Sequence, residues 1–260
     1  MKIPVPREHG TWAMLYAPIL CAVVSVGRLD FRFFLFLLST TAAFFLRDPL
    51  ETWIRLRLLN SADSARLSFL RNWSAAYLVL AVLPAAWLIL GFDLWWLPLF
   101  AAIFIVMLAL HVFWISTKSD RQVQAELTAV VALSSSAAAC RYAMTGAVDS
   151  MAFLLWALNA MFFASSVFYV KMRVSRVARK HQTSHAVMLS CLYHLLLAAT
   201  LALLATKGWI PWIVLLAFAP ILIRAFTGVL SRGRLSLTRI GVSEVVFTVV
   251  FVSIMILSFR

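Results

Sequence analysis

The stretch SAAYLVLAVLPAAWLILG, residues 74–91, contains no charged residue over 18 consecutive positions. A helix of about 20 mainly apolar residues crosses the hydrocarbon core of a bilayer. Similar apolar runs recur along the whole chain of 260 residues, which is 63% hydrophobic with a mean hydropathy of +0.95. Soluble domains are about 45–50% apolar, so a soluble fold of this length could not bury so much apolar surface. The sequence therefore predicts an all-α integral membrane protein.

Nine such segments account for most of the chain, and no linker or low-complexity tract separates them. This organisation predicts a single integral membrane domain over residues 1–260, a bundle of about nine transmembrane helices. The segments are residues 11–26, 31–45, 74–91, 94–116, 126–144, 150–170, 185–205, 209–223 and 240–258. Residues 51–71 alternate apolar and basic side chains and are too polar to cross a bilayer. They predict a helix that lies on the membrane surface.

The basic residues are divided unequally between the two ends of these segments. Of the 23 Lys and Arg residues, 18 lie at one set of ends and five at the other. Basic loops stay in the cytoplasm, so this division predicts a cytoplasmic N-terminus and, after nine crossings, an external C-terminus. Trp95, Trp96, Trp209 and Trp212 begin two segments on the outer side, where an aromatic belt is expected. The net charge of +13 therefore reflects membrane orientation, which argues against nucleic-acid binding.

Ionisable residues cost about 2.5–3.5 kcal/mol each at the centre of a membrane helix, so those near membrane depth are candidates for a functional site. Arg7, Glu8 and His9 directly precede the first segment. Such a run anchors a helix at the interface, or it binds an anion or moves a proton. Since His9 alone changes charge near neutral pH, His9 and Glu8 are the candidate catalytic residues.

A second group, Arg47, Asp48 and Glu51, follows the second segment. Asp48 and Glu51 are three residues apart and share a face of a helix, which suits a Mg²⁺ ion bound together with a substrate phosphate. Glu51 also lies four residues before Arg55, the favoured orientation for a helical ion pair. We favour this local pairing.

A third group follows the sixth segment, where Tyr169, Arg173, Arg176 and Lys180 form one stripe at helical spacing. Basic clusters in this position orient the protein and contact anionic lipid headgroups. A stripe directed into the bundle would instead form a site for a phosphate or carboxylate.

Four further polar residues lie within the predicted helices. Glu126 opens a segment rich in Ala and Ser, whose small side chains let helices approach closely. We therefore expect the fifth segment at the centre of the bundle, with Glu126 facing a polar cavity. Glu244 lies about one turn inside the last segment, and neither acid has an adjacent basic residue. Asn159 and His194 fall near the middle of their segments and predict interhelical hydrogen bonds.

The charged residues of these groups lie near the cytoplasmic ends of their segments, so we expect one cavity open to the cytoplasm. The expected ligand-binding residues are Arg7, Arg47, Asp48, Glu126, Lys171 and Arg173. Arginine suits this role because its planar fork grips a phosphate or carboxylate with two parallel hydrogen bonds. The sequence contains no nucleotide-binding loop, nucleophile elbow or His/Cys metal cluster, so it predicts no metal site and assigns no cofactor.

The sequence PREHGTWAML, residues 6–15, resembles the beginning of the YwiC-like family of bacterial membrane proteins. Softer matches are FLRDPL at residues 45–50, ELTAVVALSSS at residues 126–136 and YVKMRV at residues 169–174. The resemblance implies a location in the bacterial cytoplasmic membrane, and it implies no reaction.

The predicted architecture is also similar to that of the UbiA-type prenyltransferases, which have nine helices and a cavity facing the cytoplasm. That likeness implies an isoprenoid or lipid substrate, whose diphosphate is held through Mg²⁺ by acidic motifs after helices two and six. This chain has only Asp48 and Glu51 at the first position and is basic at the second. The departure argues against Mg²⁺-assisted ionisation of a diphosphate.

These features together predict a protein that binds an amphiphilic or phosphate-bearing anion, such as an isoprenoid or lipid substrate, in a cytoplasm-facing cavity. Membrane lipids are its other expected partners. A transporter for a small anion is one alternative, although the sequence shows no inverted repeat and no pair of helices broken by Gly or Pro. A non-catalytic assembly factor of a membrane complex is another. The sequence leaves open whether the protein is an enzyme.

Overall fold

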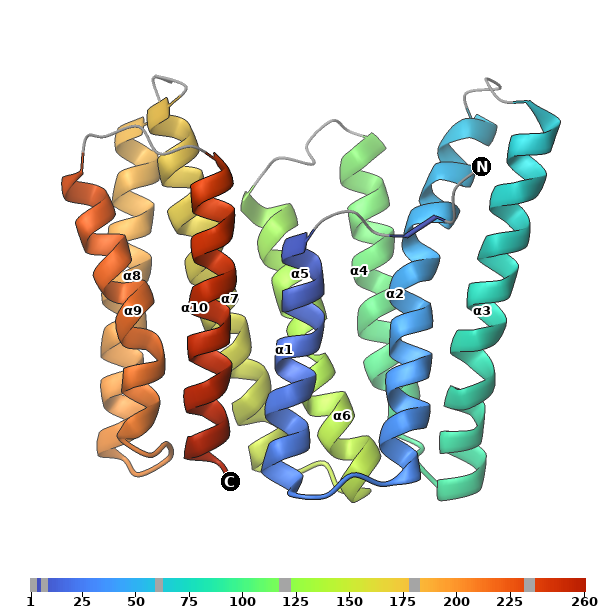
Figure 1. The fold of residues 1–260 in the computed structure, drawn as a ribbon, viewed down its shortest axis with the longest axis horizontal. Helices are drawn as coiled ribbons and strands as arrows, with labels where there is room; N and C mark the ends of the chain where they lie inside the picture. The colour runs from blue at the N-terminus through green and yellow to red at the C-terminus, as the bar shows by residue number, and fades with distance from the viewer. Residues whose placement is uncertain (1–3, 6–8, 59–62, 117–122, 178–182, 232–236) are drawn as a thin grey trace.

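The computed structural model describes residues 4–5, 9–58, 63–116, 123–177, 183–231 and 237–260. These residues form ten helices and no strand. The helix axes are roughly parallel to one another, and the chain runs up and down the bundle (Figure 1). The helices are α1 (His9–Val26), α2 (Phe31–Leu58), α3 (Ser64–Phe92), α4 (Leu97–Ser116), α5 (Val123–Ser134), α6 (Ser136–Thr145), α7 (Ser150–Val177), α8 (Thr183–Thr206), α9 (Ile213–Leu230) and α10 (Leu237–Ser258).

The described chain crosses the bundle nine times, because only Ser135 separates α5 from α6 and the two form one crossing. Seven helical segments are long and apolar enough to cross a membrane, and two shorter apolar helices, Gly10–Val26 and Leu97–Met107, complete the nine crossings. α1 begins at one end of the bundle and α10 finishes at the other (Figure 1). The chain is a multi-pass membrane protein, and the predicted all-α fold class is confirmed.

α2 and α3 form a long hairpin that corrects one prediction. The surface helix predicted over residues 51–71 is wrong for the described part of this segment, because α2 continues to Leu58 and α3 already begins at Ser64. Ion pairs at helical spacing stabilise the extension of α2: Glu51 lies 3.8 Å from Arg47 and 3.7 Å from Arg55. At the start of α3, the carboxylate of Asp63 accepts a hydrogen bond from the backbone N–H of Ala65.

The crossing made by α5 and α6 is broken in its middle (Figure 1). Ser135 Oγ donates to the carbonyl of Ala132 at 2.6 Å, and Trp156 Nε1 on α7 donates to the carbonyl of Val131 at 2.9 Å. Side-chain donors that reach helical carbonyls in this way bend a helix. This break was not expected from the sequence, which has neither Gly nor Pro here.

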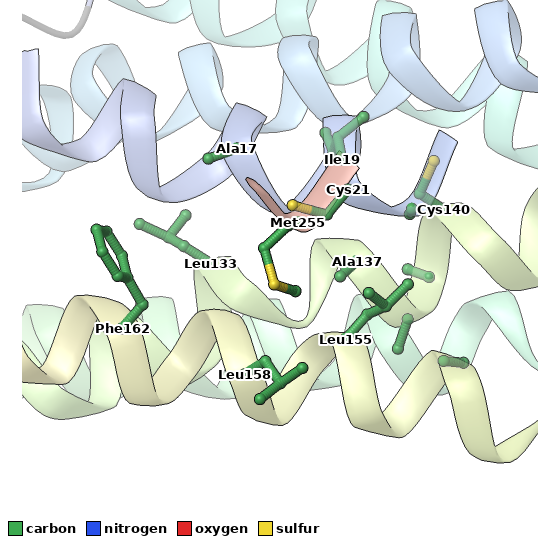
Figure 2. Packing of buried hydrophobic residues seen from close by; sticks show 14 of the residues in the cluster. Ala17, Ile19, Cys21, Leu133, Ala137, Cys140, Leu155, Leu158, Phe162 and Met255 are labelled. Atoms are coloured by element: carbon green, nitrogen blue, oxygen red, sulfur yellow. The ribbon is translucent and has the colours of Figure 1, made fainter. Parts of the chain in front are cut away.

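The centre of the bundle is built from small residues, as predicted for the fifth segment. Val123–Thr145 is the most buried of the seven long spans, with 61% of its most apolar stretch inside the protein. Ala137 and Ala143 of α6 are fully buried, which lets α6 pack closely against α1 and α7. Figure 2 shows side chains of α1, α5, α6, α7 and α10 pointing into this core, among them Ala17, Leu133 and Leu155.

The predicted aromatic belt lies at one end of the bundle. Trp95 and Trp96 precede α4, and Trp209 and Trp212 precede α9, at the end where α10 finishes (Figure 1). All four side chains are exposed. Amphipathic rings at the edge of an apolar bundle suit the membrane interface.

Candidate functional site

The C-terminal half of α7 carries the polar contacts that join the helices near the end where α1 begins. Its side chains contact four neighbouring helices, α5, α8, α9 and α10. α7 therefore brings together polar groups that are far apart in the sequence.

Lys171 of α7 forms an ion pair with Glu126 of α5, with 2.6 Å between Nζ and Oε1. The side chains are 24% and 40% exposed respectively, so the pair lies at the edge of the bundle and not in its core. The sequence placed Glu126 on the central helix, but its partner is 45 positions away and no sequence pattern connects them. The structure thus brings two predicted ligand-binding residues together.

The side chains of Arg173 and Arg176 cap the C-terminal end of α9. Nη1 of Arg176 donates to the carbonyls of Gly228 and Ser231 at 2.7 and 3.1 Å, and its Nη2 donates to Val229 at 2.9 Å. Arg173 is 1% exposed, and its Nη1 donates to the carbonyls of Gly228 and Ser231 at 3.3 and 3.2 Å. The last carbonyls of a helix lack partners within the helix and attract cations. The described members of the predicted stripe are therefore directed inward, and both arginines bind backbone; Lys180 lies outside the described residues.

A buried ionic cluster lies between α7, α9 and α10. Arg224 of α9 is 8% exposed and forms an ion pair with Glu244 of α10 through Nη1. Ser166 of α7 donates to the other oxygen of Glu244 at 2.5 Å. The guanidinium lies 4.2 Å from the ring centroid of Tyr169 and 4.8 Å from that of Phe247. The signal in the sequence was the isolated Glu244, whose partner precedes it by 20 positions.

His194 forms the interhelical hydrogen bond predicted for it. Its Nε2 lies 2.8 Å from Oγ of Ser165 on α7, and its Nδ1 lies 2.6 Å from the carbonyl of Ser190 within α8. Asn159 donates through Nδ2 within α7, to the carbonyl of Leu155 at 2.8 Å, and its side chain also meets the Cys21 thiol of α1.

The remaining predicted site residues are not gathered into one place by the described part of the chain. Arg7 and Glu8 lie outside the described residues, as does the side chain of His9, the first residue of α1. Arg47 and Asp48 lie on α2, where Glu51 forms the local ion pair with Arg55 that we favoured and a second one with Arg47. Figure 1 shows α1 and α5 between α2, which carries Arg47, and α7, which carries Arg173.

The opposite end of the bundle carries an ion pair that the sequence did not lead us to expect. Nε and Nη2 of Arg141 donate to the carboxylate of Asp149 at 2.9 and 2.7 Å, and Nη1 donates to Ser25 Oγ at 2.9 Å. Asp149 also accepts from the backbone N–H of Ala152 at 2.8 Å, which caps α7. The hydrogen bond from Arg141 is the main reason that the pKa of Asp149 is lowered. These contacts join α1, α6 and α7 and hold this end of the bundle together.

Comparison with known proteins places the chain in a family. Residues 5–141 match the family model described as YwiC-like protein. The chain belongs to the YwiC-like family. The uncharacterized protein YwiC of Bacillus subtilis (strain 168) is 28% identical over 262 residues, covering 99% of this chain and 98% of the relative. No solved structure matches.

The two matches cover the YwiC-like chain differently. The family model ends within α6, so it includes Glu126 but none of the polar contacts made by α7. The alignment with the Bacillus relative extends over nearly the whole chain, including α7, α9 and α10. Family membership therefore assigns no activity to either ionic cluster.

Proposed function

We propose that this member of the YwiC-like family binds an amphiphilic anion at the basic end of the bundle. The observation that carries the proposal is the ion pair between Lys171 and Glu126. It lies on the C-terminal half of α7, where the sequence concentrates basic residues, and both side chains remain partly exposed. A partly exposed cation paired with a carboxylate attracts a second anion at lower cost than a sealed pair.

The membrane setting determines which anion fits. An ion-pairing group at the edge of an apolar bundle is accessible to a ligand whose charged head stays at the interface while its tail lies against the helices. The basic end is the cytoplasmic end by the positive-inside rule, so the ligand would bind from the cytoplasmic leaflet of the bacterial inner membrane. Isoprenoid and lipid phosphates belong to this class, and a UbiA-like arrangement would have the same polarity.

The proposal is tested with purified protein in a neutral detergent. Dodecyl phosphate should raise the melting temperature more than dodecanol, its uncharged analogue, and Lys171→Gln should reduce that difference. Lys207→Gln is the matched control, because Lys207 lies after α8 at the opposite end of the bundle and is exposed. Equal shifts with dodecyl phosphate and dodecanol in the wild-type protein would refute anion binding.

One feature of the structure favours the alternative of a small-anion transporter. The break between α5 and α6 lies in the middle of a crossing, and transporters often use broken helices at their binding sites. Their broken helices usually occur in pairs related by an internal repeat, whereas α5 and α6 form one broken crossing. Flux of phosphate into proteoliposomes, compared with empty vesicles, distinguishes the transporter from the binding protein.

A further inference from the structure

The guanidinium of Arg224 has one edge in an ion pair and one edge without a hydrogen-bond partner among the described residues. Nη1 forms the ion pair with Glu244, and the rings of Tyr169 and Phe247 lie against the cation. Nε and Nη2 are buried and have no hydrogen-bond partner among the described residues. Each N–H group left unpaired in a low-dielectric site costs free energy, so this arrangement needs an explanation.

We propose that the unpaired edge of Arg224 is a binding site for a singly charged oxyanion, a carboxylate or a phosphodiester. Nε and Nη2 donate in parallel along one edge of the planar guanidinium, which matches two oxygens on one carbon or phosphorus atom. This site goes beyond the proposed function. It involves the face of α7 that meets α9 and α10, whereas Lys171 faces α5.

The charge already present limits the charge of the ligand. Arg224 and Glu244 together are neutral, so a monoanion leaves one net negative charge and a phosphate monoester leaves about two. Burial penalises the second charge heavily, which favours the monoanion.

The position of the cluster indicates how such a ligand would enter. Arg224 lies six residues before the end of α9, or about 9 Å at 1.5 Å per residue. Glu244 is 22% exposed, and its neighbours Val242 and Val245 are exposed on the outer face of α10. The site is therefore within reach of the headgroup of an amphiphile that lies against α10.

The test uses full-length protein in neutral detergent and laurate as the probe, with dodecanol as the uncharged analogue. Bound laurate is counted by native mass spectrometry and its affinity is measured by titration. We expect Arg224→Lys to weaken laurate binding about tenfold or more, because lysine keeps the positive charge but has no fork. Arg176→Lys is the matched control, since Arg176 binds the carbonyls of α9 and is expected to leave laurate affinity unchanged.

A second variant of the same site should raise the affinity for laurate. Glu244→Gln removes the competing negative charge and should tighten laurate binding several-fold. Laurate affinity that is unchanged by both Arg224→Lys and Glu244→Gln overturns the proposal. A loss of laurate affinity in Arg176→Lys as large as that in Arg224→Lys also overturns it. If Arg224→Lys does not fold, an unchanged affinity in Glu244→Gln is decisive against it.

The source of the oxyanion is distinguished by two further probes. Free acetate should compete with laurate if a small carboxylate suffices, whereas nanodiscs that contain phosphatidylglycerol should compete if a lipid phosphodiester is the ligand. Loss of dodecyl phosphate binding in Lys171→Gln with laurate binding intact would separate this site from the proposed one.

Discussion

Gly228 of α9 is in contact with the ring of Tyr169 of α7 at a distance that only glycine permits. A Cβ atom at position 228 would lie 2.7 Å from Cε2 of Tyr169. The ring is buried and holds Arg224 on its face, so it cannot move aside without disturbing the ionic cluster. The absence of a side chain at Gly228 therefore sets the spacing of α7 and α9 where the cluster forms.

Gly228→Ala should lower the free energy of unfolding by about 1–3 kcal/mol, the usual cost of overpacking. The measurement is thermal or denaturant unfolding in detergent. Gly241→Ala on α10 is the control, because a Cβ atom at position 241 would have nothing within 4 Å and alanine favours a helix. Equal stability of the two variants would mean that the Tyr169 ring can move aside without lowering the free energy of unfolding.

Glu126→Ala should destabilise the protein by at most about 1 kcal/mol, because the ion pair with Lys171 is partly exposed. A fully buried partner left without its counter-charge would cost more, about 3–5 kcal/mol. A double-mutant cycle with Lys171→Ala measures the coupling directly. A coupling well above this limit would show that the membrane seals the pair from water.

The stability of the end formed by α1, α6 and α7 should depend on pH through Asp149. Arg141 holds the pKa of Asp149 below its ordinary value. A carboxylate with a lowered folded-state pKa stabilises the protein above its unfolded pKa, about 3.9, and this contribution is lost as the pH falls through the folded value. Asp149→Asn should flatten this part of the stability profile while asparagine still caps α7. If Asp149→Asn loses stability at low pH as much as the wild-type protein does, Asp149 is not the group responsible.

The two ends of the chain should lie on opposite sides of the membrane, with the basic end in the cytoplasm. Nine crossings and the distribution of Lys and Arg lead to this expectation. A C-terminal alkaline phosphatase fusion should be active, and a C-terminal green fluorescent protein fusion should be dark. The reverse result would invert the orientation and place Lys171 and Arg224 on the external side.

The sequence by itself determined the class of fold and the number of crossings. Lipid offers no hydrogen bonds to the backbone, so each apolar run must form its own helix, and hydropathy is enough to locate it. The run of small residues that begins near Glu126 likewise identified the central helix, because only small side chains let several helices approach it. Even so, the ends of α2 and α3 were misjudged, since helical ion pairs around Glu51 extend α2 beyond its apolar part.

The partners of the charged residues were decided only by the tertiary structure. Which residues meet depends on the rotation of each helix about its axis and on how closely neighbouring helices pack, and both arise from contacts summed over the whole bundle. Glu126 could thus be recognised as an acid on the central helix, but not as the partner of Lys171. The charge of Arg173 is visible in the sequence, whereas the carbonyls at the end of α9 that it meets are not. Arg224 and Glu244 meet because Gly228 lets α7 and α9 close around Tyr169, a relationship that exists only once the helices are packed.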